Sequence, residues 1–263
     1  MHMWEKYASI LEAILVFGGS RIESQAELYD FIRQVQSMTV KDRTLDYWVK
    51  PLTSQHLVDG PPYKLGPGLG LVVGVAVGSE SVRAGLYDAN GEQVAPRAFD
   101  AEPQLGQLQG HPSLIIDRVC QAVERVLEES DAALQMESAW VRGVSVALPA
   151  PIDRAGHVDS VCPSPWREKP FIEPLRSALL QVSRIEKVIS DAGANSPFMV
   201  DVVNDANADV IDLAFDLARS QPSAPDDYTL SKMLMSIRLG GGVGAGILKL
   251  GRFAPAEGFA LSR

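Results

Sequence analysis

The chain has few cysteine, histidine and aromatic residues: 2 cysteines and 4 histidines among 263 residues, and 7% aromatics. Two separated thiols, Cys120 and Cys162, provide no disulfide framework, and we expect both to be buried or unreactive. The sequence contains no run of about 18 apolar residues, which argues against a membrane-spanning helix. Glu5, Lys6 and Glu12 interrupt any N-terminal signal sequence. These absences predict a cytoplasmic protein with no membrane partner.

The net charge is −9, from 24 basic and 33 acidic side chains, and it is unevenly distributed. Up to Leu65 the chain has 7 basic and 8 acidic residues, a net charge of −1, whereas the remaining 17 basic and 25 acidic residues carry −8. A near-neutral N-terminal part can still contact nucleic acid phosphates, although a strongly basic surface would be stronger support for DNA binding.

Residues 200–208 run a valine-rich apolar stretch into an Asn-Asp pair. The apolar spacing predicts a strand over residues 197–203 and a helix over 206–219, with Asn204 and Asp205 at the junction. Asp205 is suited to accept the proton of a hydroxyl that attacks a phosphate, and Asn204 to hydrogen-bond a neighbouring hydroxyl. The same pair is equally suited to cap the helix, and this motif alone leaves both readings open.

Three further segments place glycine or proline at the ends of apolar stretches. Residues 74–88 read GVAVGSESVRAGLYD, residues 143–158 read GVSVALPAPIDRAGHV, and residues 237–253 read IRLGGGVGAGILKLGRF. Together with residues 200–208, these segments resemble in order and spacing the ROK family, which contains bacterial repressors, open reading frames and sugar kinases. The resemblance extends over most of the chain after residue 66.

The resemblance implies an α/β protein in two parts. Residues 1–65 would form a winged helix-turn-helix DNA-binding domain. Residues 66–263 would form an actin-like, ribonuclease H-like ATPase-type sugar kinase domain. The chain ends before the part in which family members carry a histidine and closely spaced cysteines for zinc, so we expect an incomplete second lobe and no structural zinc.

The resemblance also implies the roles of particular residues. Asp205 would be the base of a sugar kinase, vestigial in this chain, and Asn204 and Asp205 would bind the sugar. The phosphate and nucleotide loops would be formed by Gly78, Ser79, Gly240, Gly241, Gly242 and Gly244.

The two loops depart from the family pattern. Ala76, Ser79 and Glu80 stand where active kinases have Asp, Gly and Thr, and Gly241 replaces a Thr. The change at Ala76 removes a carboxylate that would support the metal, and Glu80 brings a negative charge toward phosphate oxygens. We therefore expect weakened nucleotide binding, no required cofactor, no bound metal, and a role for ATP with Mg²⁺ only if kinase activity is retained.

The first 65 residues have helical apolar spacing over 4–17, 24–35 and 40–52. Ser24 and Glu27 form a capping box that starts the second helix. We expect Pro51 to end the third helix near Lys50, while Leu45, Trp48, Val49 and Leu52 face the core. Residues 54–65 would form a short wing and linker.

The third helix would be the recognition helix in the major groove. Lys41, Arg43 and Thr44 lie at its start, where Arg can address guanine and Lys can hold phosphate, and Lys50 adds a further positive charge. The alternative is that these side chains form a solvated helix face.

In the kinase-like part, we predict strands over 69–77, 82–87, 93–99 and 141–148, and helices over 112–129 and 172–182. Residues 88–91 would form a hairpin turn in which Gly91 supplies a positive φ.

Three functions are consistent with these features. The first is a ROK-type transcriptional regulator that binds operator DNA as a homodimer, with the degenerate kinase-like domain sensing a sugar or sugar-phosphate effector or supporting dimerisation. The second is an ATP-dependent hexose kinase with Asp205 as the base. The third is an inactive truncated product.

Overall fold

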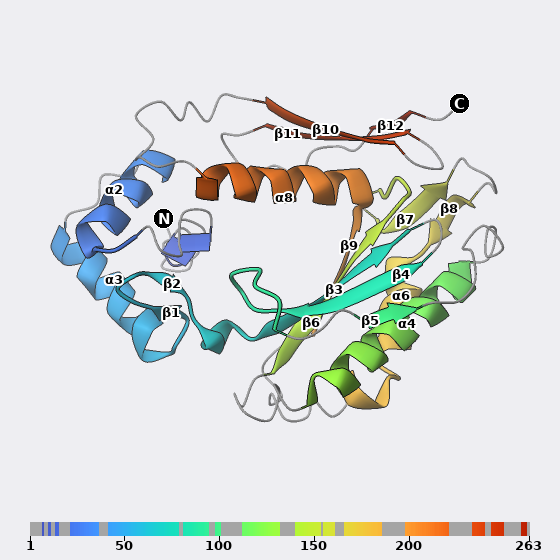
Figure 1. The fold of residues 1–263 in the computed structure, drawn as a ribbon, viewed down its shortest axis with the longest axis horizontal. Helices are drawn as coiled ribbons and strands as arrows, with labels where there is room; N and C mark the ends of the chain where they lie inside the picture. The colour runs from blue at the N-terminus through green and yellow to red at the C-terminus, as the bar shows by residue number, and fades with distance from the viewer. Residues whose placement is uncertain are drawn as a thin grey trace.

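The fold was obtained as a computed structural model (Figure 1). The described residues are 7, 10–11, 14–15, 22–36, 42–78, 81–94, 98–100, 112–131, 140–153, 155–160, 166–185, 198–220, 233–239, 243–249 and 259–261. No helix within these ranges is both long and apolar enough to cross a membrane.

A five-stranded mixed sheet forms the centre of the larger part, with strand order β5-β4-β3-β6-β9. β3, β6 and β9 are mutually parallel, and β4 and β5 run antiparallel to them. Along β3 every second side chain is buried, as expected for a sheet with one covered face. The strands are β3 (Leu71–Val77), β4 (Val82–Tyr87), β5 (Ala98–Asp100), β6 (Val141–Leu148) and β9 (Met199–Asn204).

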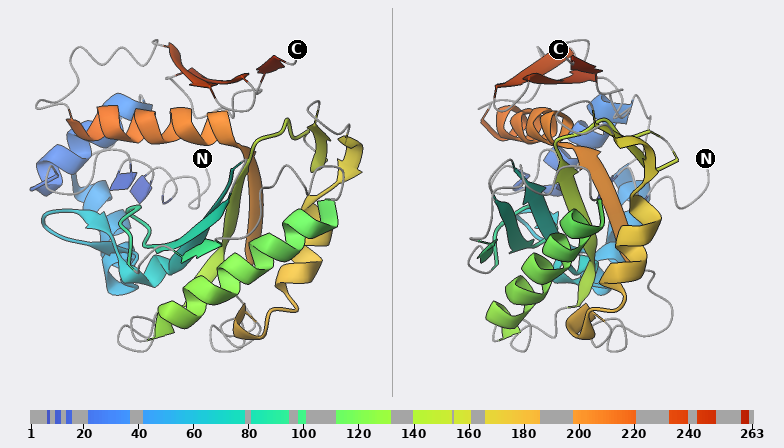
Figure 2. Two further views of the ribbon diagram at one scale, coloured as in Figure 1. Left: turned by 45° about the vertical axis from the view of Figure 1, so that its right-hand side comes forward. Right: turned by 90° about the vertical axis from the view of Figure 1, so that its right-hand side faces the viewer.

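Helices α4 (Pro112–Glu129) and α6 (Ile172–Leu179) pack against the same face of this sheet (Figures 1 and 2). The inner stripe of α4 includes Val119, Val123 and Val126, each with no exposed surface. Sheet and helices therefore share one hydrophobic core, and the α/β class predicted from the sequence is confirmed.

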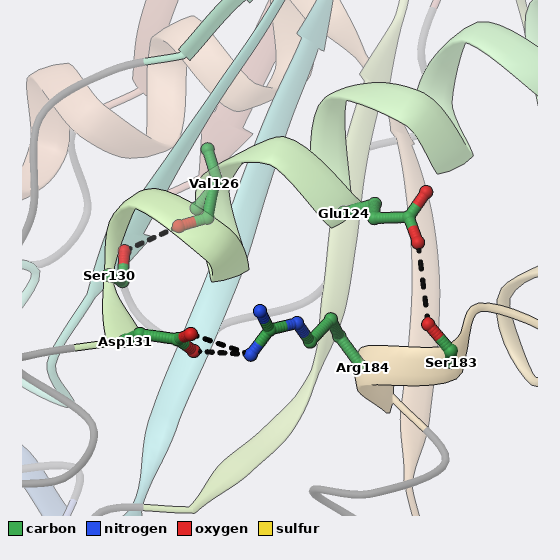
Figure 3. Close-up of polar contacts among 6 residues, drawn as sticks. All are labelled: Glu124, Val126, Ser130, Asp131, Ser183 and Arg184. Atoms are coloured by element: carbon green, nitrogen blue, oxygen red, sulfur yellow. Dashed lines mark hydrogen bonds and ion pairs between the residues drawn. The ribbon is translucent and has the colours of Figure 1, made fainter.

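Polar contacts join the end of α4 to the segment after α6 (Figure 3). One guanidinium nitrogen of Arg184 lies 2.7 Å from both carboxylate oxygens of Asp131. The Ser130 hydroxyl is buried and donates to the Val126 carbonyl at 2.6 Å. The Arg184–Asp131 contact joins the segment after α6 to the end of α4, whereas the Ser130 bond lies within the end of α4 itself.

A further layer consists of α8 (Asp205–Ser220) and a three-stranded antiparallel sheet, β10 (Met233–Leu239), β11 (Val243–Lys249) and β12 (Phe259–Leu261). Figure 2 shows this sheet lying along α8. β7 (His157–Ser160) and β8 (Trp166–Pro170) form a separate hairpin.

The described residues up to 65, here named the N-terminal module, have a core of their own. Helices α2 (Gln25–Gln36) and α3 (Asp42–Ser54) are followed by the antiparallel strands β1 (Val58–Asp59) and β2 (Lys64–Leu65). The described residues between 7 and 15 are helical. A short 3-10 turn, η1 (Pro67–Leu69), leads into β3. The buried residues of this core are Ile10, Ile14, Ile22, Leu28, Ile32, Trp48, Val49, Leu52, Val58, Tyr63 and Leu65.

Several predicted elements are confirmed. Strands 82–87 and 141–148 and helix 112–129 have the predicted bounds. The capping box is present: the Glu27 amide donates to the Ser24 hydroxyl, and the Glu27 carboxylate accepts from the Ser24 amide, both at 3.2 Å. Gly91 has φ 79°, as its turn requires.

The prediction that Pro51 ends the third helix is wrong, because α3 continues to Ser54. Trp48, Val49 and Leu52 are buried as predicted, and their packing holds the last turn in helical form despite the missing proline N–H. The strand predicted to start at residue 69 starts at Leu71, because residues 67–69 form the 3-10 turn. The helix predicted to reach residue 182 ends at Leu179.

The predicted strand over 93–99 is described at its two ends. Gln93 bridges Tyr87, and β5 pairs with β4, while residues 95–97 lie outside the described residues. The expected turn at 37–39 also lies outside them.

Candidate functional site

The carboxyl ends of β3, β6 and β9 meet at one edge of the central sheet, here named the carboxyl edge. The register aligns Ala76 of β3 with Ala147 of β6, and Leu148 of β6 with Asn204 of β9. Ligands of open α/β sheets bind outside such an edge. The predicted sugar and phosphate residues in β9 and after β3 therefore converge on one place.

Asn204 is the last residue of β9, and its side chain caps α8. Its Oδ1 accepts hydrogen bonds from the amides of Ala206 at 3.1 Å and Asn207 at 3.3 Å. Its Nδ2 donates to the Ala150 carbonyl at 3.1 Å, which ties β9 to the turn after β6. Of the two roles that the sequence left open for Asn204, the structure shows the helix cap. The predicted contact with a sugar hydroxyl would have to use the second amide hydrogen or displace one of these bonds.

Asp205 is the first residue of α8 and is half-buried. Its Oδ1 accepts from the Ala206 amide at 2.8 Å. A carboxylate at the first turn of a helix is stabilised by the helix dipole. Its place beside the carboxyl edge is the one that the sequence predicted for a base.

The loop after β3 is closed by a hydrogen bond from the Gly78 amide to the Ser81 carbonyl, 2.9 Å long. Ser79 and Glu80 lie outside the described residues. Ala76 is exposed on β3, so a methyl group stands where the resemblance expects a metal-supporting carboxylate.

The second glycine-rich segment joins β10 to β11. Gly244 pairs with Arg238 within this hairpin, and Gly240, Gly241 and Gly242 lie outside the described residues. Within the described ranges, no three histidine, cysteine or acidic side chains are grouped so as to hold a metal ion. Ala76 offers no ligand at the described position where the resemblance expects a metal-supporting carboxylate, and we derive no phosphoryl transfer step here.

A turn beyond the carboxyl edge, which the sequence reading missed, contains an Asp-His pair. Asp153 accepts hydrogen bonds from the backbone amides of Ala155 and His157, and its other oxygen lies 3.1 Å from the His157 imidazole. The amide and ring contacts of His157, in that order, lower the pKa of Asp153. The aspartate three residues before Gly156 was the available sequence signal.

The outer face of α3 is exposed. Tyr47, Lys50 and Ser54 recur at spacings of three and four residues and are exposed, whereas Trp48 and Leu52 are buried. Tyr47 is 69% exposed. Lys41 and the side chains of Arg43 and Thr44 lie outside the described residues. The sequence reading missed Tyr47, although its position between Arg43 and Lys50 indicates this face.

Comparisons with known proteins give no matching family model and no matching curated protein. Among solved structures, the fold resembles that of a ROK family transcriptional regulator, a homologue of the Escherichia coli MLC protein. The TM-score is 0.51 and the identity 16%, over 97% of this chain and 58% of that one. The chain thus has the fold of a ROK protein, as its motifs predict.

Two kinases are similar over a smaller part of the chain. A ROK family glucokinase from Streptomyces griseus, solved with glucose and AMPPNP, has TM-score 0.46 and 22% identity, over 73% of this chain and 49% of that one. An inorganic polyphosphate/ATP-glucomannokinase from Arthrobacter sp. strain KM has TM-score 0.45 and 23% identity, over 72% and 62%. The chain therefore spans about half to three fifths of the length of these three structures.

Proposed function

We propose that the chain is a ROK-type transcriptional regulator that binds operator DNA through its N-terminal module. The observation that carries the proposal is the exposed outer face of α3 on a module with its own core. A helix buried on one side and open along Tyr47 and Lys50 on the other can enter a major groove without disturbing its own packing.

The residues of α3 would contact different parts of the DNA according to their position along the helix. Lys41, Arg43 and Thr44, at the start of the helix, would approach bases and flanking phosphates. Tyr47 and Lys50 would follow along the same face, with the phenol and the ammonium group available to phosphate oxygens. The β1–β2 hairpin would serve as the wing of a winged helix.

The larger part would sense a sugar or sugar-phosphate effector or support a homodimer. The cap formed by Asn204 and the methyl group of Ala76 both make this edge better suited to a binding role than to catalysis. A two-fold symmetric protein matches a two-fold symmetric operator, which is the reason to expect a dimer.

One observation favours the alternative, a hexose kinase: Asp205 stands at the carboxyl edge, where a base would act. A coupled assay with hexose and Mg-ATP separates the two functions. The regulator proposal expects no turnover in the wild type beyond that of Asp205→Ala. Turnover in the wild type that is abolished by Asp205→Ala would establish the kinase.

DNA binding itself is tested with two matched lysine variants. Lys50 and Lys169 are both exposed, but Lys169 lies in β8 of the other part of the chain. We expect Lys50→Ala to weaken binding and to reduce the slope of log K against log salt by about 1, the value for one lost phosphate contact. Lys169→Ala should leave both unchanged, and equal behaviour of the two variants would contradict the assignment.

A further inference from the structure

Leu65 of β2 forms a pair of hydrogen bonds with a side chain from the other part of the chain. Its amide donates to Oδ1 of Asn90, and its carbonyl accepts from Nδ2 of Asn90, both at 2.9 Å. Asn90 lies in the turn that follows β4. One carboxamide therefore satisfies both backbone groups of a residue 25 positions away.

The β1–β2 pairing explains why these backbone groups are accessible. The Gly66 amide donates to the Leu57 carbonyl at 2.9 Å, so this pair is joined across the hairpin. Successive residues of an antiparallel strand direct their backbone groups to opposite edges. The N–H and C=O groups of Leu65 therefore face away from β1. Asn90 takes the position of a neighbouring strand at that edge.

The 88–91 turn holds Asn90 in a fixed orientation. One carboxylate oxygen of Asp88 accepts from the amides of Asn90 at 2.9 Å and Glu92 at 2.8 Å, and the other lies 3.2 Å from Nδ2 of Asn90. The Gly91 amide donates to the Asp88 carbonyl at 3.1 Å. The carboxamide is thus oriented by the turn itself, which lowers the entropy lost in binding Leu65.

Apolar contacts accompany the hydrogen bonds. Ala89 of the same turn and Leu69 of η1 are half-buried against the core of the N-terminal module. β4, which directly precedes this turn, lies in the central sheet and pairs with β3 along its whole length. The contact therefore connects the module to β4, which begins beside the carboxyl end of β3 and runs antiparallel to it, away from the carboxyl edge.

We propose that Asn90 is a positioning residue that fixes the N-terminal module, and with it the outer face of α3, on the β3–β4 hairpin. Its role in reading DNA rests on the proposed function, whereas the fixing of the module does not. A movement of β4 would reach the module through this contact, so Asn90 is one place where the two parts of the chain are coupled.

Amide hydrogen exchange of the full chain tests the contact. We expect Asn90→Ala to raise the exchange rate of the Leu65 amide by about 10- to 100-fold, the range that follows from the loss of two hydrogen bonds. Amides of α4 should keep their rates, which shows that the change is local. An unchanged rate at Leu65 would overturn the proposal.

Two further variants separate this role from a general loss of structure. Asn90→Asp keeps an acceptor for the Leu65 amide but loses the donor to its carbonyl, so its exchange rate should lie between those of the wild type and Asn90→Ala. Glu92→Gln changes an exposed side chain of the same segment and should leave the rate unchanged. A rise in Glu92→Gln equal to that in Asn90→Ala would contradict a specific role for Asn90.

DNA binding by the same variants tests the positioning role. We expect Asn90→Ala to reduce discrimination between DNA from the chain's own upstream region and scrambled DNA by about fivefold or more, because a loosely held module must be ordered again on binding. Faster exchange with unchanged discrimination would overturn that role. A wild type that does not discriminate would overturn the proposed function and leave the exchange result standing.

Discussion

Asn204 joins three backbone segments through one side chain at a strand–helix junction. Its carbonyl oxygen caps α8, and its amide group holds the turn at Ala150. The residue beside it, Asp205, has a carboxylate at the positive end of the same helix. Sequence alone left capping and ligand contact open, because both require the same residue types at the same place.

Asn204→Ala should lower the stability of the chain by about 2 kcal/mol, since it removes a helix cap and one further hydrogen bond. The expected fall in the thermal midpoint is about 4–8 °C. Asn204→Asp keeps the acceptor for the α8 amides but loses the donor to Ala150. It should therefore lower the stability by about half as much as Asn204→Ala. A midpoint for Asn204→Ala equal to that of the wild type would refute the capping role.

Cys120 should react slowly with thiol reagents. Burial, followed by the charges of Asp117 and Glu124, raises the pKa of this thiol to about 11. Only the thiolate is nucleophilic, so at pH 8 alkylation should be about 100-fold slower than for a thiol of ordinary pKa, with a rate that still increases above pH 10. Rates measured with iodoacetamide in a Cys162→Ser background, together with a free cysteine peptide, provide the comparison. A rate that reaches its plateau near pH 9 would contradict this assignment.

At the scale of elements, α8 and the β10–β11–β12 sheet depend on an unusually close backbone approach. A Cβ at Gly246 would lie 2.0 Å from the Ala206 carbonyl oxygen. β11 therefore rests directly against the first turn of α8, beside Asp205. Further along the same face of α8, Val210 and Ala214 pack against Leu248 of the same strand.

Gly246→Ala should separate β11 from α8 and lower the stability by about 1–3 kcal/mol, as overpacking does elsewhere. The neighbour across the ladder, Ser236, provides a matched control, because Ser236→Ala changes a residue at the same position of the hairpin without adding volume. Denaturant unfolding followed by circular dichroism measures both variants. Equal stability of Gly246→Ala and Ser236→Ala would show that the backbone approach tolerates a side chain.

At the scale of the whole molecule, the chain contains separate hydrophobic cores joined by a short connection. Leu65 belongs to the N-terminal core and Leu71 to that of the central sheet, with η1 between them. Gly66 and Gly68 pass so close to the end of α3 that a Cβ at either would lie within 2.5 Å of a backbone oxygen of His56 or Gln55. The connection is therefore packed against the module.

The elements that sequence could predict are those with strong local patterns. Strand 141–148 and helix 112–129 have continuous apolar periodicity, and the Ser24 capping box depends on residues three apart. Pro51 was misjudged because the burial of Trp48 and Leu52 outweighs a local preference. The pairing of Asn90 with Leu65 leaves no local trace, since it joins residues far apart in the sequence.

The central claim, that the N-terminal module reads an operator, is tested most directly by fluorescence anisotropy of the purified chain. DNA from its own upstream region is compared with scrambled DNA at two salt concentrations, because phosphate contacts weaken with salt while base contacts persist. We predict tighter binding to the native fragment, with a preference that survives the added salt. Equal binding to both fragments that disappears at the higher salt concentration would contradict the claim.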